Sequence, residues 1–233
     1  MRGFTPRMVA RLESTMRLRS DIIIDRIAER GEADFVVDVA SELPLMAIAE
    51  LLGVPTEDRH KLFEWSNRLV GNSDPEYVGS AEEATAAATE LYGYFNQLGE
   101  ERRANPQDDI ITKLITEVEG DALGPHEFET FCLVLTVAGN ETTRNATSHG
   151  LLALLENPDQ MQKLRDHPEL LDSAIEEILR WASPVIHFRR TATRDTEIGG
   201  QAIAEGDSVV MFHISANRDE DVFEDPFRFD IAR

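Results

Sequence analysis

Cysteine is almost absent from this sequence, because Cys132 is the only one among 233 residues. A single cysteine excludes an internal disulfide, a zinc site built from several thiolates and an iron–sulfur cluster held by this chain alone. The neighbours of Cys132 are apolar, which favours a buried, unreactive thiol over a nucleophile. The six histidines are scattered and never form a metal-ligand pair at helical spacing. The side chains of this sequence therefore predict no metal site of their own.

Long apolar runs and positive charge are also scarce. No segment approaches the roughly 20 uncharged apolar residues of a membrane-spanning helix, and the arginine-rich start lacks the apolar core of a signal peptide. The 44 acidic side chains outnumber the 23 basic ones, and the formal net charge of -21 would repel the phosphates of nucleic acids. We therefore expect a soluble, cytoplasmic protein that has no membrane span and binds no nucleic acid.

Hydrophobic periodicity, caps and stop signals predict a mostly helical chain. With 42% hydrophobic residues the chain can bury a substantial core, and no linker, repeat or low-complexity tract divides it. Pro44 predicts a bend or a local boundary in the second helical segment. The expected helices run from the Thr5 cap to Gly31, Asp34 to Leu52, Thr56 to Val70, Ala81 to Arg103, Asp108 to Val118, Pro125 to Glu156, Pro158 to Asp166, and Pro168 to Trp181. We expect Gly71–Pro75 to form a loop and Gly120 to end the fifth helix.

The character of the sequence changes after Trp181. Two segments alternate between apolar and polar residues and carry β-branched residues beside glycine turn signals. Both features are typical of strands. They are Arg189–Glu197 and Asp207–Ile214, whereas Asp219–Arg233 is expected to be irregular. The predicted fold class is therefore mainly α with a small β portion, in a single domain over residues 1–233.

An unusual polar segment, Gly139–Thr143, lies inside the longest predicted helix. Glycine in a helix interior costs about 1 kcal/mol relative to alanine, and threonine is a poor helix former. One interpretation is a helix that ends at Gly139 and restarts with Thr142 or Thr143 as N-cap. The other is a local opening in which the Thr142 hydroxyl bonds outward rather than back to its own helix.

A second motif, Glu177-x-x-Arg180, places a carboxylate and a guanidinium three residues apart on one helix. Taken alone, such a pair is typical of a helix surface and contributes only a few tenths of a kcal/mol. It predicts no function by itself.

Taken together, the order and spacing of these motifs resemble the cytochrome P450 family, of the soluble bacterial type. The resemblance rests on Ala138–Thr143, Glu177-x-x-Arg180, Pro184–Arg190 and Pro226–Phe229, and it runs from Phe4 to Arg233. It implies part of the family's fold and a heme-dependent monooxygenase that inserts one atom of dioxygen into a hydrophobic small molecule. Electrons would come from NAD(P)H through a ferredoxin or similar carrier and its reductase. The sequence over Ala138–Gly150 and Arg189–Gln201 is similar to the actinobacterial branch of the family, which oxidises sterols or long alkyl side chains.

The resemblance also implies roles for individual residues. Glu141 and Thr142 resemble the acid and alcohol that supply protons during cleavage of the O–O bond, a step that needs a relayed proton. Ala138 and Gly139 would line the oxygen groove, since small residues let the helix backbone approach the heme. Arg190 resembles the arginine that pairs with a heme propionate.

Two further groups of residues correspond to the family's substrate pocket and to its structural cluster. The positions that face the substrate above the heme correspond to Val134, Val137, Val185 and Ile186. The glutamate–arginine–arginine cluster that locks the segment after the strands against the helix corresponds to Glu177, Arg180 and Arg228. A buried network of three charges is costly unless every hydrogen bond is made, so this cluster is expected to serve folding.

The sequence departs from the family at the axial ligand of the heme iron. That ligand is a cysteine in a glycine-rich loop shortly after the region that Pro226–Phe229 resembles, and Cys132 lies elsewhere without the glycine context. We therefore expect an internal fragment of a longer protein, lacking the first helices and the cysteine loop, and inactive by itself. Two alternatives stay open: a peroxide-using relative, which would be expected to lack the Glu141–Thr142 pair, and a non-catalytic helical remnant of a truncated gene.

Overall fold

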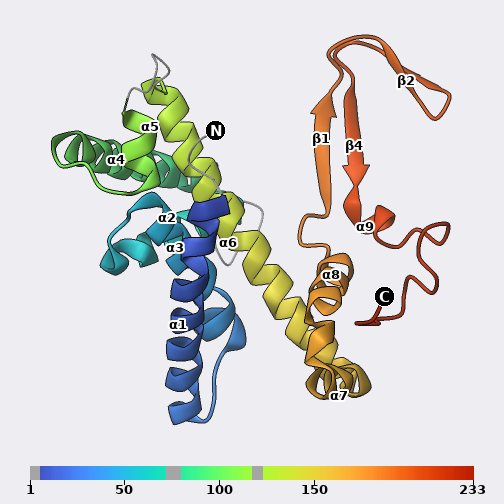
Figure 1. Ribbon diagram of the computed structural model, residues 1–233. Helices are drawn as coiled ribbons and strands as arrows, with labels where there is room; N and C mark the ends of the chain where they lie inside the picture. The colour runs from blue at the N-terminus through green and yellow to red at the C-terminus, as the bar shows by residue number, and fades with distance from the viewer. Residues whose placement is uncertain (1–5, 72–79, 117–122) are drawn as a thin grey trace. The chain divides into compact units, whose positions relative to one another are not determined.

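The chain divides into two compact units, residues 1–144 (unit 1) and 145–233 (unit 2), and each is described by itself. The computed structural model describes residues 6–71, 80–116 and 123–233, with the burial of side chains from residue 13 onward (Figure 1). Helices dominate both units and the strands are few and short, so the predicted class, mainly α with a small β portion, is confirmed. The expectation of a single domain stays a prediction.

Unit 1 is built from helices that follow the predicted segments closely. Its helices are α1 (Pro6–Arg30), α2 (Glu42–Leu52), α3 (Arg59–Val70), α4 (Ala81–Ala104), α5 (Ile110–Ile115) and the first part of α6 (Pro125–Glu156), with a π-helical turn at Val36–Ala40 and a 3-10 turn at Thr56–Asp58. The boundary predicted near Pro44 falls at Ser41, and Pro44 lies in the first turn of α2, where a missing N–H costs little. The Thr5 cap, most of the predicted loop at 71–75 and the helix end at Gly120 lie outside the described residues.

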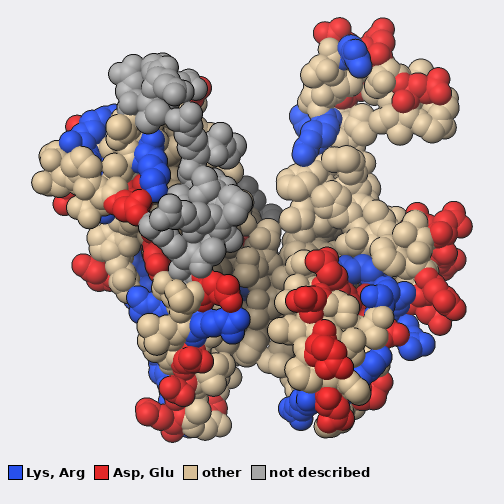
Figure 2. All heavy atoms as spheres, in the orientation of Figure 1, with Lys and Arg blue, Asp and Glu red and all other residues tan. Residues whose placement is uncertain are grey.

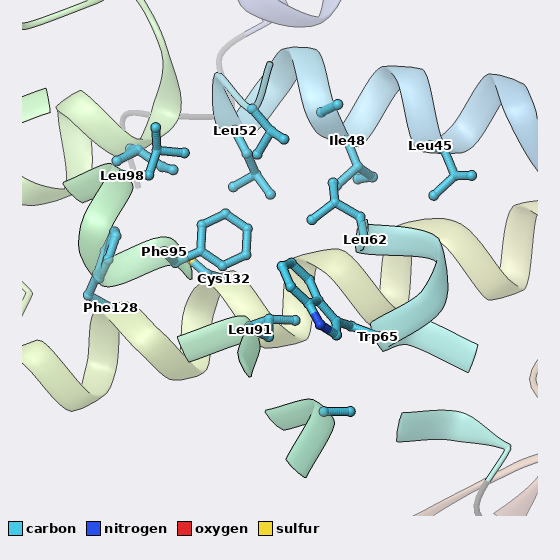
Figure 3. Close-up of a cluster of buried hydrophobic side chains, with 14 residues drawn as sticks. Leu45, Ile48, Leu52, Leu62, Trp65, Leu91, Phe95, Leu98, Phe128 and Cys132 are labelled. Carbon is cyan, nitrogen blue, oxygen red and sulfur yellow. The ribbon is translucent and has the colours of Figure 1, made fainter. Parts of the chain in front are cut away.

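The core of unit 1 is an apolar cluster between α2, α3, α4 and α6. Figure 3 shows its side chains pointing toward one another, with Phe95 and Leu91 of α4 fully buried against Leu52 and Leu62. Each such side chain contributes about 1.5–3 kcal/mol on burial. Cys132 belongs to this cluster and is 0% exposed, and burial raises the pKa of its thiol to about 12. The predicted inert, buried thiol is confirmed.

Polar contacts hold the ends of three helices of unit 1 together. Gly53 ends α2 with a φ of 73°, a left-handed conformation that glycine adopts without strain. Asp109 caps α5 by accepting from the backbone N–H of Thr112 at 2.7 Å. Arg102 of α4 donates to Asp109 and to the carbonyl of Gly53, both at 2.6 Å. These bonds join the C-terminal end of α2 to the start of α5.

Unit 2 consists of helices followed by two short antiparallel ladders. Its elements are the end of α6, α7 (Pro158–Asp166), a 3-10 turn (Pro168–Leu170), α8 (Leu171–Ala182), β1 (His187–Thr191), β2 (Thr196–Ile198), β3 (Gln201–Ile203), β4 (Ser208–Phe212) and α9 (His213–Ala216). β1 pairs with β4, and β2 pairs with β3 through a turn at Gly199 and Gly200, whose φ values are 58° and 82° (Figure 1). A small core around Phe229 and Ile231 packs against Ala153 and Ala174.

The strand prediction was wrong in two details. Arg189–Glu197 is not one strand, because the chain leaves the first ladder at Ala192, which bonds across to Asp207 and Gly206 before β2 begins. The predicted strand Asp207–Ile214 stops at Phe212, since His213 and Ile214 open the short helix α9. The irregular character predicted for Asp219–Arg233 is confirmed.

The surface agrees with the composition. Acidic side chains are spread over the visible face of both units, as the net charge of -21 requires (Figure 2). None of the helices among the described residues combines the length and the apolar character that a membrane span needs.

Candidate functional site

Helix α6 runs without interruption through the segment Gly139–Thr143. The interpretation in which the helix ends at Gly139 and restarts is therefore wrong. The Thr142 hydroxyl donates to the carbonyl oxygen of Ala138 at 3.0 Å, so the prediction that it bonds outward is also wrong. A helix of about nine turns absorbs the small local penalty of one glycine. A hydroxyl that bonds the carbonyl four residues earlier is satisfied inside the helix and tends to bend it.

Close packing against α2 gives Gly139 a structural reason to be glycine. A Cβ atom at this position would fall 2.3 Å from Cδ1 and 2.9 Å from Cγ1 of Ile48. A side chain at this position would require Ile48 to move, so the packing of α6 against α2 favours glycine here. The role of Gly139 beside an oxygen groove stays a prediction.

Glu141 is held by an ion pair that the motif alone did not reveal. Arg144, one turn further along α6, donates from Nη2 to the Glu141 carboxylate. The other terminal nitrogen of Arg144 donates to Oδ1 of Asn67 in α3 at 3.0 Å, and its guanidinium lies 5.7 Å from the centre of the Phe63 ring. The signal for Arg144 is visible in the sequence as a second Glu-x-x-Arg spacing, but Asn67 is 77 residues away and carries no local signal.

One face of α6 in unit 1 presents small and apolar side chains to the surface. Val134, Ala138 and Thr142 follow one another at intervals of four residues, which places them along one face. Val134 is 54% exposed and Ala138 is exposed as well, while Val137 beside them is partly buried. This face of α6 therefore offers apolar contacts at Val134 and Ala138.

The remaining predicted binding residues lie in unit 2. Ile186 is 55% exposed just before β1, and Val185 beside it is partly buried. Arg190 in β1 is exposed, with its guanidinium 5.2 Å from the centre of the Phe188 ring and one N–H donated to the carbonyl of Arg189. Among the described residues no carboxylate pairs with Arg190, so its charge is available to an anion. Val185, Ile186 and Arg190 thus belong to unit 2, whereas Val134, Ala138 and Thr142 belong to unit 1.

Glu177 and Arg180 form the centre of a buried polar network in unit 2. Their side chains are 1% and 6% exposed, and they are joined by two hydrogen bonds, of 2.6 and 2.8 Å. Arg180 also donates to the carbonyls of Asn217 and Pro226, at 2.7 and 2.8 Å. Glu177 accepts from the backbone N–H of Asp230 at 2.9 Å. The pair therefore fastens the irregular segment after α9 to α8.

The third member of this network is Arg233, and the prediction of Arg228 was wrong. The Arg228 side chain is 63% exposed and pairs with Asp230 at 3.1 Å, and only its backbone carbonyl accepts from Arg180. Arg233 instead donates to Glu177 at 3.2 Å and to the Arg228 carbonyl at 3.0 Å. A chain that folds back on itself brings the later arginine to the buried carboxylate.

Cys132 is not a candidate for the axial ligand of a heme iron. No group of three or more histidine, cysteine, aspartate or glutamate side chains there could hold a metal ion. Cys132 lies in the core cluster, and its raised pKa keeps it a protonated thiol rather than a thiolate ligand.

Solved structures with the same architecture define the class. A Mycobacterium marinum cytochrome P450 in complex with pseudoionone superposes with a TM-score of 0.93 at 39% identity, over 99% of this chain and 57% of that one. The sequence profile described as Cytochrome P450 matches residues 76–233. This chain belongs to the cytochrome P450 family, whose members carry heme.

Two curated relatives are similar to this chain over its whole length. A steroid C26-monooxygenase of Rhodococcus jostii is 50% identical over 233 residues, which are 100% of this chain and 48% of the relative. A linalool 8-monooxygenase of Pseudomonas putida is 44% identical over 234 residues, 100% of this chain and 58% of the relative. The chain thus spans about half the length of the curated relatives it matches.

Proposed function

We propose that the complete protein is a heme-dependent monooxygenase that inserts one atom of dioxygen into a hydrophobic small molecule. The observation that carries this proposal is the adjacent acid and alcohol, Glu141 and Thr142, on α6 beside an exposed stripe of small and aliphatic side chains. The electrons would come from NAD(P)H through a ferredoxin or similar carrier and its reductase, and the reaction would take place in the cytoplasm.

The residues of this chain would hold one face and one edge of the heme. When bound, the heme supplies the activation of dioxygen. Ala138 and Gly139 would let the α6 backbone approach its face, because neither carries a side chain beyond Cβ. Arg190 would neutralise a propionate through charge-assisted hydrogen bonds, which its lack of a carboxylate partner among the described residues supports.

Glu141 and Thr142 would move protons to the reacting oxygen. The Glu141 side chain is 22% exposed while paired to Arg144, so it stays anchored and can still exchange protons with solvent. The Thr142 hydroxyl donates to the Ala138 carbonyl, which leaves its oxygen lone pairs as acceptors for an incoming proton. It would give up its own proton to the reacting oxygen of dioxygen as it accepts another.

The substrate would be an aliphatic molecule such as a sterol or a long alkyl chain. Exposed Val134 and Ile186, with Val137 and Val185 beside them, offer aliphatic contacts and no charge. The names of the relatives support this choice, since steroids and linalool are both hydrophobic.

The proton relay is tested by replacing Thr142 with alanine in the complete enzyme. We expect heme binding and dioxygen consumption to persist, with at least about tenfold less hydroxylated product per dioxygen and the remainder released as hydrogen peroxide, because general acid catalysis contributes about 10²–10⁴-fold. Thr142→Ser should restore most of the coupling, and Thr143→Ala is the matched control on the next position.

The outcomes separate the remaining possibilities. Full coupling in Thr142→Ala, with sterol hydroxylation intact, would remove Thr142 from the relay. A complete protein that binds no heme, judged by the absence of a carbon monoxide difference spectrum, would favour the non-catalytic remnant. Product formation from hydrogen peroxide alone, at the rate seen with redox partners, would favour the peroxide-using relative.

A further inference from the structure

Two residues of α3 hold the guanidinium of Arg144 on α6. Oδ1 of Asn67 accepts a hydrogen bond from Nη1 of Arg144 at 3.0 Å, and Cζ of Arg144 lies 5.7 Å from the centre of the Phe63 ring. Phe63 and Asn67 are four residues apart, so they lie on one face of α3. An acceptor at one nitrogen and an aromatic ring beside the guanidinium together restrict its position and its rotation. We call Phe63 and Asn67 the α3 clamp.

The guanidinium that the α3 clamp holds is also the partner of Glu141. Its second terminal nitrogen, Nη2, donates to the Glu141 carboxylate. The nitrogens of a guanidinium form a rigid, planar fork, so the bond from Nη1 to Asn67 limits where Nη2 can lie. Asn67 and Arg144 are buried, whereas the Glu141 side chain is 22% exposed. The chain of contacts therefore leads from a buried amide on α3 to a carboxylate that solvent can reach.

We propose that Asn67 is a positioning residue for proton transfer by Glu141, and that it acts through Arg144. This inference rests on the proposed monooxygenase function and extends it to α3, a helix that carries neither the acid nor the alcohol. A glutamate–arginine pair on one helix must give up side-chain entropy to hold a single geometry. The α3 clamp restricts the arginine beforehand, so the Glu141 carboxylate is held in one orientation.

The competing explanation is that the α3 clamp only packs α3 against α6. A packing role predicts that replacing Asn67 lowers stability, while molecules that do fold and bind heme transfer protons normally. A positioning role predicts slower proton transfer in molecules that are folded and loaded with heme. The fraction of consumed dioxygen that appears in product, called the coupling below, separates the two roles when it is measured per heme-loaded molecule.

The first experiment replaces Asn67 with leucine in the complete enzyme, which keeps the size of the side chain and removes the acceptor. We expect the coupling to fall about threefold to tenfold, with hydrogen peroxide released instead, because a misplaced proton donor slows product formation. The solvent isotope effect on product formation in D₂O should rise. Asn67→Asp, which retains an acceptor oxygen, should keep most of the coupling. The matched control is Asn96→Leu, an exposed position on α4 whose amide donates to Glu129.

The second experiment tests whether Asn67 acts through Glu141. Glu141→Ala should lower the coupling by itself, and adding Asn67→Leu should cause no further loss, because the group that Arg144 positions is then absent. A further loss as large as that of Asn67→Leu alone would overturn the inference. If Asn67→Leu yields no heme-loaded protein, Arg144→Lys replaces it, since an ammonium lacks the planar fork. Unchanged coupling in Arg144→Lys would likewise overturn the inference.

The failure of this inference is distinguishable from the failure of the proposed function. Unchanged coupling and an unchanged solvent isotope effect in Asn67→Leu, together with lowered coupling in Glu141→Ala, would overturn the role of Asn67 alone. Unchanged coupling in Glu141→Ala would remove Glu141 from the proton relay, and the role of Asn67 would fall with it.

Discussion

Two glutamate–arginine pairs with the same spacing behave differently in the two units. Glu177 and Arg180 of unit 2 are 1% and 6% exposed, and backbone groups of the following segment complete their hydrogen bonds. Glu141 of unit 1 is 22% exposed, and Nε of its partner Arg144 has no protein partner among the described residues. The same i, i+3 pattern thus yields a closed network in one unit and an open one in the other.

The difference shows that the surroundings of an ion pair decide its role. A buried pair lowers the free energy of the folded state only when the remaining donors and acceptors are also satisfied, because desolvation of both charges is costly. The network at Glu177 meets that condition and can serve as a lock for the chain after α9. The pair at Glu141 keeps a carboxylate near solvent, which suits the proton transfer proposed for it.

The largest effect is expected from removing the buried carboxylate. Glu177→Ala would leave Arg180 and Arg233 without their counter-charge, which should destabilise the complete enzyme by about 3–5 kcal/mol. The thermal midpoint and the yield of heme-loaded protein measure this loss. Glu141→Ala is the matched comparison and should cost less, about 1–3 kcal/mol, because Glu141 is 22% exposed and Arg144 keeps its bond to Asn67. Equal losses in both variants would show that the two pairs do not differ in kind.

A smaller effect should distinguish the two arginines near Glu177. Arg233→Ala removes hydrogen bonds to a buried carboxylate and to backbone carbonyls, and should cost about 1.5–3 kcal/mol. Arg228→Ala removes only an exposed pair with Asp230 and should cost less than about 1 kcal/mol. Thermal unfolding of both variants compares them directly. A larger loss for Arg228 than for Arg233 would restore the cluster that the sequence predicts.

The smallest effect concerns acid pH. The hydrogen bond from the backbone N–H of Ala232 is the main cause that lowers the pKa of Asp230, assisted by Lys163 and Arg228. Because the pKa in the folded state is below the unfolded value of about 3.9, this carboxylate stabilises the fold above that pH and loses its contribution as the pH falls through the folded value. Asp230→Asn should therefore lower the thermal midpoint slightly at neutral pH, and this difference should shrink as the pH falls below the unfolded value. An equal difference in thermal midpoint between the variant and the unmodified protein at every pH would contradict this predicted pH dependence.

The helices were the most predictable part of the fold. Pro125–Glu156 and Pro158–Asp166 were predicted with the bounds that the structure has, because Asn157-Pro158 ends one helix and begins the next by local stereochemistry. The break between β1 and β2 could not be predicted in this way. It depends on the backbone hydrogen bonds that Ala192 makes with Asp207 and Gly206 on the opposite side of the ladder. Such long-range pairing is not determined by the local propensity of the residues.

In the candidate site, too, features that depend on local sequence were predicted and features that depend on long-range contacts were not. Local motifs identified Glu141, Thr142, Glu177 and Arg180 as a set, and the resemblance assigned each a role. They could not show that Thr142 bonds back to Ala138, that Ile48 packs closely over Gly139, or that Asn67 holds Arg144. Each of these facts depends on contact between residues in different turns or different helices.

The sequence by itself determined the helical class, the inert cysteine and the membership in a heme-carrying family, because periodicity, caps and motif spacing are local properties of the chain. Only the tertiary structure decided which arginine completes the network at Glu177 and which residue of α3 holds Arg144. Arg228 and Arg233 carry the same side chain five residues apart, and the path of the backbone after α9 alone brings Arg233 to the buried carboxylate.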